Sequence, residues 1–76
     1  MSPKLPVVSG RQLIRALKKF GYVEVRQKGS HVRMRNAADP QRQSVTIPLH
    51  DEIASGTLRR VLRDARVTVD ELISAL

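Results

Sequence analysis

The first stretch of regular hydrophobic spacing lies near the start of the chain. Leu13, Ile14, Leu17 and Phe20 recur every three or four residues, which predicts a helix over about residues 10–20. Ser9 and Gln12 have the spacing of a capping box at its start, and Gly21 fits a left-handed cap at its end. Residues 1–8, with two prolines, are predicted to be an extended lead-in.

The spacing then changes to alternation, which predicts three short strands, with a polar loop at 36–42 before the third. The register that best separates apolar from polar positions pairs Val25 with Val32 and Val23 with Met34. This register allows a turn of two or four residues, and we expect four, Gln27–Ser30, because Lys28 suits a two-residue turn poorly.

Helical spacing returns over about 54–65, and Thr68 with Glu71 predicts a capping box before a short terminal helix. The chain is therefore predicted to be one α+β domain over residues 1–76, in the order helix, three strands, helix, terminal helix. With both helices on one face of the sheet, the predicted core comprises Leu13, Leu17, Val23, Val25, Val32, Met34, Val45, Ile47, Leu58 and Leu62. The open face would carry Tyr22, Glu24, Arg26, His31, Arg33, Arg35 and Thr46, with Arg26 opposite His31 and Glu24 opposite Arg33.

The charge of the chain is large and unevenly placed. Its 76 residues carry a net charge of +7, and residues 1–50 hold ten basic side chains against two acidic ones. Such a surface suits a polyanion such as a nucleic acid, although a surface that is merely solvated can carry the same net charge.

Cysteine is absent, which excludes a disulfide scaffold and fits a cytoplasmic protein. Apolar runs are too short for a membrane span, and the first residues lack the apolar segment of a signal peptide.

The chemistry of the predicted open face centres on one histidine. Glycine-rich nucleotide-binding loops are absent, and a metal site built from His31, His50, Asp51 and Glu52 has no recognisable ligand spacing. His31 could instead act as general acid or base on RNA, without a cofactor or metal, to give a 2′,3′-cyclic phosphate. The phosphate contacts would come from Arg26, Lys28, Arg33, Arg35 and the backbone amides near Gly29 and Ser30. The alternative is that His31 is an ordinary exposed strand residue.

Four short runs resemble the HicA family of bacterial and archaeal toxins in their order and spacing. They are Lys19-Phe20-Gly21-Tyr22, Gly29-Ser30-His31, Ile47-Pro48-Leu49-His50 and Gly56-Thr57-Leu58, and the resemblance covers about residues 9–66. It implies a fold similar to a double-stranded RNA-binding domain, an mRNA interferase activity independent of the ribosome, and a HicB-type antitoxin that covers the active site.

The resemblance also implies roles for two histidines. The catalytic histidine of the family corresponds to His31, and its Pro-x-His element corresponds to Pro48 and His50. For His50 we expect a hydrogen bond that anchors the loop rather than catalysis. Because the cleavage moves two protons, a second group is needed, and the candidates are Tyr22, Lys28 and water.

Two other functions fit the same sequence. A non-catalytic RNA-binding module would use the same basic face and read the shape of the RNA. A protein-interaction subunit or a DNA-binding adaptor would use the terminal helices, where Arg59, Arg60, Arg63 and Arg66 lie.

Overall fold

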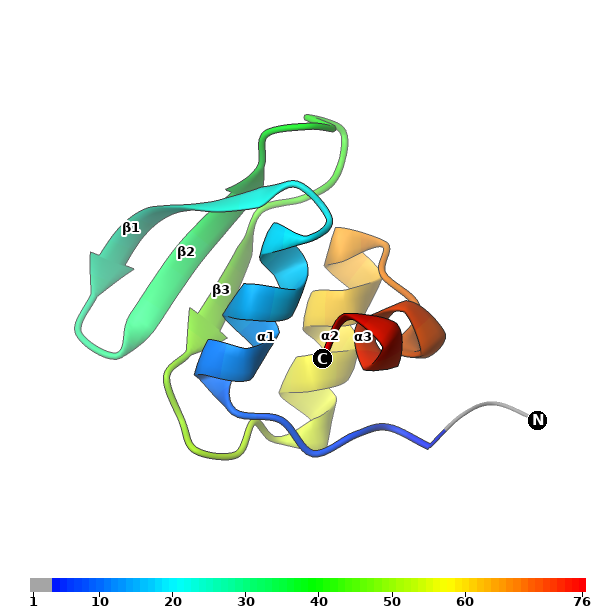
Figure 1. Cartoon of the computed structure of the whole chain (residues 1–76). Coiled ribbons are helices and arrows are strands. Elements are labelled where there is room, and N and C mark those ends of the chain that lie inside the picture. Colours follow the sequence, from blue (N-terminus) through cyan, green and yellow to red (C-terminus); the bar gives the residue numbers. More distant parts are fainter. Residues whose placement is uncertain (1–3) are drawn as a thin grey trace.

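The computed structural model describes residues 4–76, which form three helices and a three-stranded antiparallel sheet. The elements follow the order α1 (Gly10–Lys18), β1 (Tyr22–Lys28), β2 (His31–Asn36), β3 (Val45–Pro48), α2 (Ser55–Ala65) and α3 (Val69–Ala75) (Figure 1). The predicted α+β class and element order are confirmed, and they are consistent with a fold like that of a double-stranded RNA-binding domain. Residues 4–8 of the predicted lead-in are neither helix nor strand, and residues 1–3 lie outside the described part.

Helix α1 begins where the sequence predicts because its capping box is complete. The Gln12 amide donates to Ser9 Oγ at 3.1 Å, and the Ser9 amide donates to Gln12 Oε1 at 2.8 Å, which satisfies two amides at the helix start. After α1 the chain turns at Gly21, whose φ of +93° lies in the region that favours glycine. A Cβ on Gly21 would lie 2.7 Å from the Cβ of Ala38, so a larger residue does not fit there.

The two C-terminal helices also match their predicted positions. Helix α2 ends at Ala65 and is capped by Arg66, which adopts a left-handed conformation with φ of +57°. The second capping box starts α3: the Glu71 amide donates to Thr68 Oγ1 at 3.1 Å, and the Thr68 amide donates to Glu71 Oε1 at 2.9 Å. Helix α3 packs against α1 and buries Leu72 completely.

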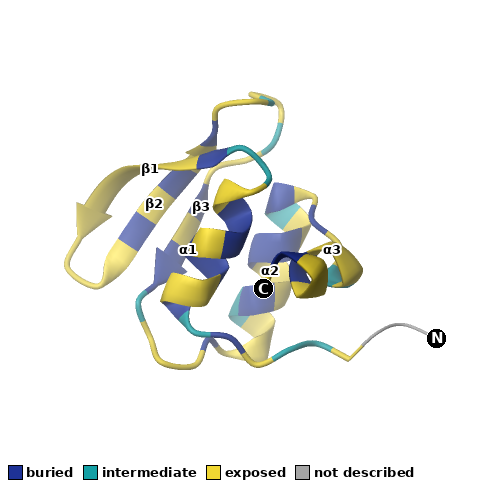
Figure 2. Ribbon diagram, viewed as in Figure 1, coloured by how far each residue is buried: buried dark blue, intermediate teal, exposed yellow. Residues whose placement is uncertain are grey.

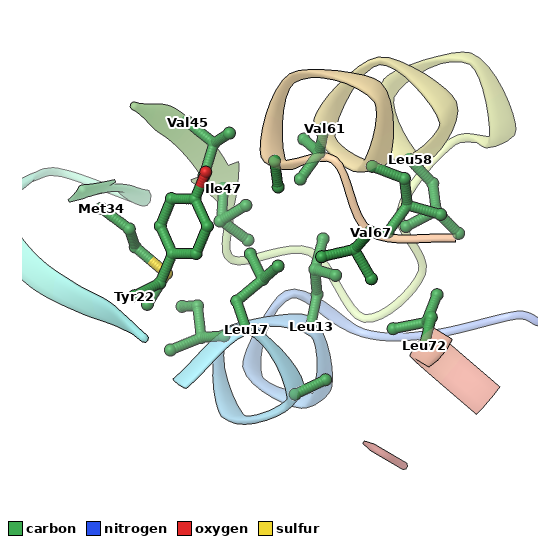
Figure 3. Close-up of a cluster of buried hydrophobic side chains, with 14 of the residues drawn as sticks. Leu13, Leu17, Tyr22, Met34, Val45, Ile47, Leu58, Val61, Val67 and Leu72 are labelled. Carbon is green, nitrogen blue, oxygen red and sulfur yellow. The ribbon is translucent and has the colours of Figure 1, made fainter. Parts of the chain in front are cut away.

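The core lies between the sheet and the helices, which cover one face of it (Figure 1). Burial alternates along β2, as Figure 2 shows, so that one face of this strand contacts the core and the other is exposed. Figure 3 shows the centre of the core, in which Tyr22 lies among aliphatic side chains from the sheet and the helices. The buried residues include these predicted positions: Leu13, Leu17, Val32, Met34, Val45, Ile47, Leu58 and Leu62.

Strand β1 contains a β-bulge that the sequence does not reveal. Glu24 lies opposite Met34 and Arg26 lies opposite Arg33, so Val25 is an extra residue between the two pairs. Directly opposed residues share a face of the sheet. The bulge therefore keeps Glu24 on the helix side while it places Arg26 on the open face.

The predicted register and part of the predicted core are wrong as a result. Val23 and Val25 are 38% and 46% exposed and do not pair with Met34 and Val32. Tyr22 is only 1% exposed and occupies the core in their place, because it lies opposite Asn36 on the helix side. A large ring buries more apolar surface than a valine, which favours this register.

The turn between β1 and β2 has two residues, Gly29 and Ser30, and not the four that the sequence predicts. Gly29 has a φ of +59°, whereas Ser30 is not among the residues with positive φ. A glycine with positive φ at the first central position is typical of a type II′ turn, whose twist suits a hairpin. The turn therefore depends on Gly29 and leaves Lys28 in the strand.

Asn36 is the one buried polar side chain of the described residues, and it links the turn before β1 to the loop after β2. Its Nδ2 donates to the Phe20 carbonyl oxygen at 2.8 Å, and its Oδ1 accepts from the amides of Ala38 at 2.9 Å and Asp39 at 2.7 Å. These bonds tie the turn after α1 to the loop after β2. The sequence interpretation treats Asn36 only as the first residue of a polar loop.

Candidate functional site

The open face of the sheet, which is the face away from the helices, carries a shallow basic hollow. It has a volume of about 210 Å³ and is lined by Arg26, Lys28, His31, Arg33 and Thr46. Three cross-strand pairs bring these residues together: Lys28 with His31, Arg26 with Arg33, and Arg33 with Thr46. We call this site the basic hollow. Four of the five lining residues were predicted to lie on the open face, whereas Lys28, a predicted phosphate contact, was expected in the turn and lies in β1. The predicted pairs of Arg26 with His31 and of Glu24 with Arg33 are wrong.

The basic hollow concentrates positive charge without a compensating carboxylate among its lining residues. Glu24, which the sequence places on the open face, lies on the helix side and forms an ion pair with Lys18 at 2.8 Å. Arg26 and Arg33 face each other across the strands, and like charges in this position destabilise a sheet. An anion bound between them would relieve the repulsion, so this arrangement favours a phosphate.

The backbone that carries His31 is held on both sides while its side chain remains exposed. His31 pairs with Lys28 of β1 and with Pro48 of β3. Next to it, the Leu49 amide donates to the Ser30 carbonyl oxygen at 2.7 Å, which joins the hairpin turn to the loop after β3. A strand fixed by two neighbours positions a side chain more accurately than a loop does. The imidazole is thus accessible and well placed for acid–base chemistry.

The other predicted phosphate contacts lie at different distances from this centre along the hairpin. Gly29 and Ser30 form its exposed tip, where Gln27 Nε2 donates to the Gly29 carbonyl oxygen at 3.1 Å. Arg35 is exposed on the open face opposite Val23, but it does not line the basic hollow. Thr46 accepts a long hydrogen bond of 3.4 Å from Arg33 Nη1, which steadies that guanidinium.

The two secondary candidates from the sequence lie outside the basic hollow. Tyr22 is buried on the helix side, and its hydroxyl donates to the Gln43 carbonyl oxygen at 2.6 Å, so the expectation of an exposed Tyr22 is wrong. Burial also raises the pKa of Tyr22, which makes it a poor proton donor. His50 is exposed, and its backbone carbonyl, not its imidazole, accepts the bond from the Gly10 amide at 2.9 Å that anchors the loop.

Residues 4–76 were searched for clusters of possible metal ligands and for helices that could span a membrane. In this part of the chain, no group of three or more histidine, aspartate or glutamate side chains gathers where it could hold a metal ion. Within the same residues, each helix is too short or too polar to cross a membrane.

Comparison with known proteins agrees with this picture at the level of the family. A search of curated protein sequences finds no match. A family model described as the HicA toxin of bacterial toxin–antitoxin systems matches residues 10–67, from the start of α1 to the residue before the cap of α3. Because the match spans most of the chain, the protein belongs to the HicA toxin family, whose members act together with a cognate antitoxin.

Proposed function

We propose that this protein is an mRNA interferase, an endoribonuclease that cleaves mRNA without a metal ion and acts as the toxin of its system. Toxins of this family generally cleave mRNA. The observation that carries the proposal is the basic hollow, in which an exposed imidazole stands among three cations and no carboxylate.

In the proposed reaction, His31 acts on an RNA strand that lies across the open face. The 2′-oxygen of a ribose attacks the adjacent phosphorus and loses its proton, while the 5′-oxygen of the next nucleotide leaves and gains one. The products are a 2′,3′-cyclic phosphate and a 5′-hydroxyl. His31 carries one of the two protons, and Lys28, which lies opposite it, or a water molecule carries the other. Arg26 and Arg33 offset the charge that develops on the phosphorane.

The antitoxin of the system would silence this reaction by covering the open face. We propose a partner of HicB type that presents carboxylates to the basic hollow and thereby excludes RNA. The complex would work in the cytoplasm, where mRNA is found.

Cleavage of a labelled RNA by the purified protein in EDTA tests the proposal. We expect wild type to cut the RNA and His31→Ala to cut it about 10²–10⁴-fold more slowly. His50→Ala is the matched control, because His50 is the other histidine of the chain and is also exposed, but lies outside the basic hollow. Thermal unfolding of each variant verifies that it is folded.

Two results would contradict the proposal in different ways. Equal cleavage by His31→Ala and wild type would remove His31 from the mechanism. Tight RNA binding by a folded wild-type protein without any cleavage would favour the non-catalytic RNA-binding module, which uses the same cations.

A further inference from the structure

A second hollow lies on the opposite side of the β1–β2 hairpin. It has a volume of about 260 Å³ and is lined by Arg11, Ile14, Arg15, Lys18, Glu24, Gln27, Val32 and Leu49. The tip of the hairpin extends past α1 in Figure 1, and Glu24 and Gln27, which lie on the helix side of β1, are exposed. We call this site the α1 cleft.

The rim of the α1 cleft is basic. Arg11, Arg15 and Lys18 are exposed and follow one another at helical spacing, so they share one face of α1. Lys18 is paired with Glu24, whereas Arg11 and Arg15 belong to no ion pair within residues 4–76. Ile14, Val32 and Leu49 supply an apolar floor. A positive rim above an apolar floor fits a sugar–phosphate chain better than it fits an isolated ion.

The α1 cleft and the basic hollow lie on opposite faces of strand β1. Arg26 and Lys28 line the basic hollow, and Gln27 between them lines the α1 cleft. Neighbouring strand residues lie about 3.3 Å apart and point to opposite faces, so one strand separates the two sites. Because β1 is at the edge of the sheet, no further strand among residues 4–76 blocks the way around it.

We propose that the α1 cleft binds the same RNA strand that the basic hollow cleaves, at nucleotides next to the scissile phosphate. The RNA passes around the edge of β1, and Arg11 and Arg15 contact its phosphates. This inference rests on the proposed function for its substrate, and it predicts that substrate length matters: an RNA that is confined to the basic hollow gains nothing from α1.

The test compares two double variants that remove the same charge from different helices. Arg11→Gln with Arg15→Gln alters the α1 cleft, and Arg59→Gln with Arg60→Gln is the control on the exposed face of α2. Glutamine and arginine have similar helix propensities, so both pairs preserve the helices. Binding is measured in a His31→Ala background, in which we expect cleavage to be slow, with RNAs of about 4 and about 16 nucleotides, which span the site sizes of single-strand-binding OB folds.

The expected loss follows from counterion release. Each single-strand phosphate contact changes log K by about 0.7 per tenfold change in salt, which is about fivefold in affinity between 0.1 M and 1 M salt. The Arg11→Gln, Arg15→Gln variant should therefore bind the long RNA about 25-fold more weakly than its parent at 0.1 M salt and equally at 1 M. The short RNA and the α2 control should show no such loss.

Glu24→Gln supplies a change in the opposite direction. It removes the one carboxylate that lines the α1 cleft and releases Lys18, so it should tighten binding of the long RNA about fivefold at 0.1 M salt.

Unchanged binding of the long RNA by the Arg11→Gln, Arg15→Gln variant would overturn the inference, whatever that variant does to antitoxin binding. A loss that persists at 1 M salt, or an equal loss in the α2 control, would also overturn it. Failure of the nuclease proposal is a separate result, because it shows as absent cleavage by wild type, while the cleft is judged by binding alone.

Discussion

Deletion of Val25 tests the bulge that determines which side chains reach the open face. The deletion removes the extra residue and makes Arg26 the direct neighbour of Glu24, with both still opposite their present partners, Arg33 and Met34. Because the other pairs are kept, the deletion lowers the free energy of unfolding only by the contribution of the buried part of the Val25 side chain. Val25 is 46% exposed. Since complete burial of a valine contributes about 1.5–3 kcal/mol, its deletion should cost about 1 kcal/mol.

Deletion of Arg35 is the matched control, because this residue is also exposed but lies in β2, in which every residue has a partner in β1. The deletion makes Met34 and Asn36 neighbours, and strand alternation then forces one of these buried side chains onto the open face. Removal of Met34 from the core costs about 2–5 kcal/mol. The whole domain has only about 4–11 kcal/mol of stability at this chain length.

Thermal and urea unfolding measure both deletions. For a domain of this size, 1 kcal/mol corresponds to about 4–8 °C in Tm. We therefore expect the Val25 deletion to lower the Tm by less than about 10 °C and the Arg35 deletion to lower it at least twice as far or to prevent folding. If the Val25 deletion were as harmful as the Arg35 deletion, the bulge would not absorb the change of register, and the assignment of Arg26 and Lys28 to the open face would fail.

Three further substitutions test the buried polar contacts and the caps. Asn36→Ala removes three hydrogen bonds to partly buried backbone groups, at about 0.5–1.5 kcal/mol for each, so urea unfolding should show a loss of at least about 1.5 kcal/mol. A smaller loss would mean that water replaces the side chain. Tyr22→Phe removes the bond to Gln43 and should cost about 0.5–1.5 kcal/mol. Because burial raises the pKa of Tyr22 above 10.0, wild type should lose stability as the pH rises past that value. Thermal unfolding of Tyr22→Phe should not show this loss of stability at alkaline pH. The hydrogen bonds from Thr68 lower the pKa of Glu71 below 4.5, so ionised Glu71 stabilises the fold above that pH, and this stabilisation is lost as the pH falls. Glu71→Gln keeps the capping box but removes the titrating group, so the Tm should fall less steeply at acid pH. An unchanged dependence of Tm on pH would contradict this.

The elements that the sequence predicts well are those with local causes. Both capping boxes need only two residues that are three positions apart, and the alternation of Val32 with Met34 needs only one strand. The bulge is different, because Val23 and Val25 alternate as well as any buried pair does. Their exposure is decided by Tyr22, whose hydroxyl reaches a carbonyl group twenty-one positions along the chain. Such a distant partner leaves no trace in the local pattern.

Part of the open face was predicted correctly although the register was wrong. The predicted pairing put Arg26, His31 and Arg33 outward, and the bulge returns Arg26 to that face with a different partner. Glu24 is the residue for which the difference matters chemically, because its move to the helix side removes a negative charge from the open face. The α1 cleft was not predicted at all, since it depends on how far the hairpin extends past α1.

The bulge also affects how the sheet meets other copies of the protein. Strand β1 is an edge strand with two exposed valines, a combination that invites pairing with another chain and hence aggregation. An extra residue in the middle of the strand breaks the regular order of its outward amide and carbonyl groups, and Arg26 and Lys28 add repulsion between copies. At the other edge, β3 is four residues long and ends in Pro48, which has no amide to donate. Both edges therefore carry features that disfavour pairing with a strand of another copy.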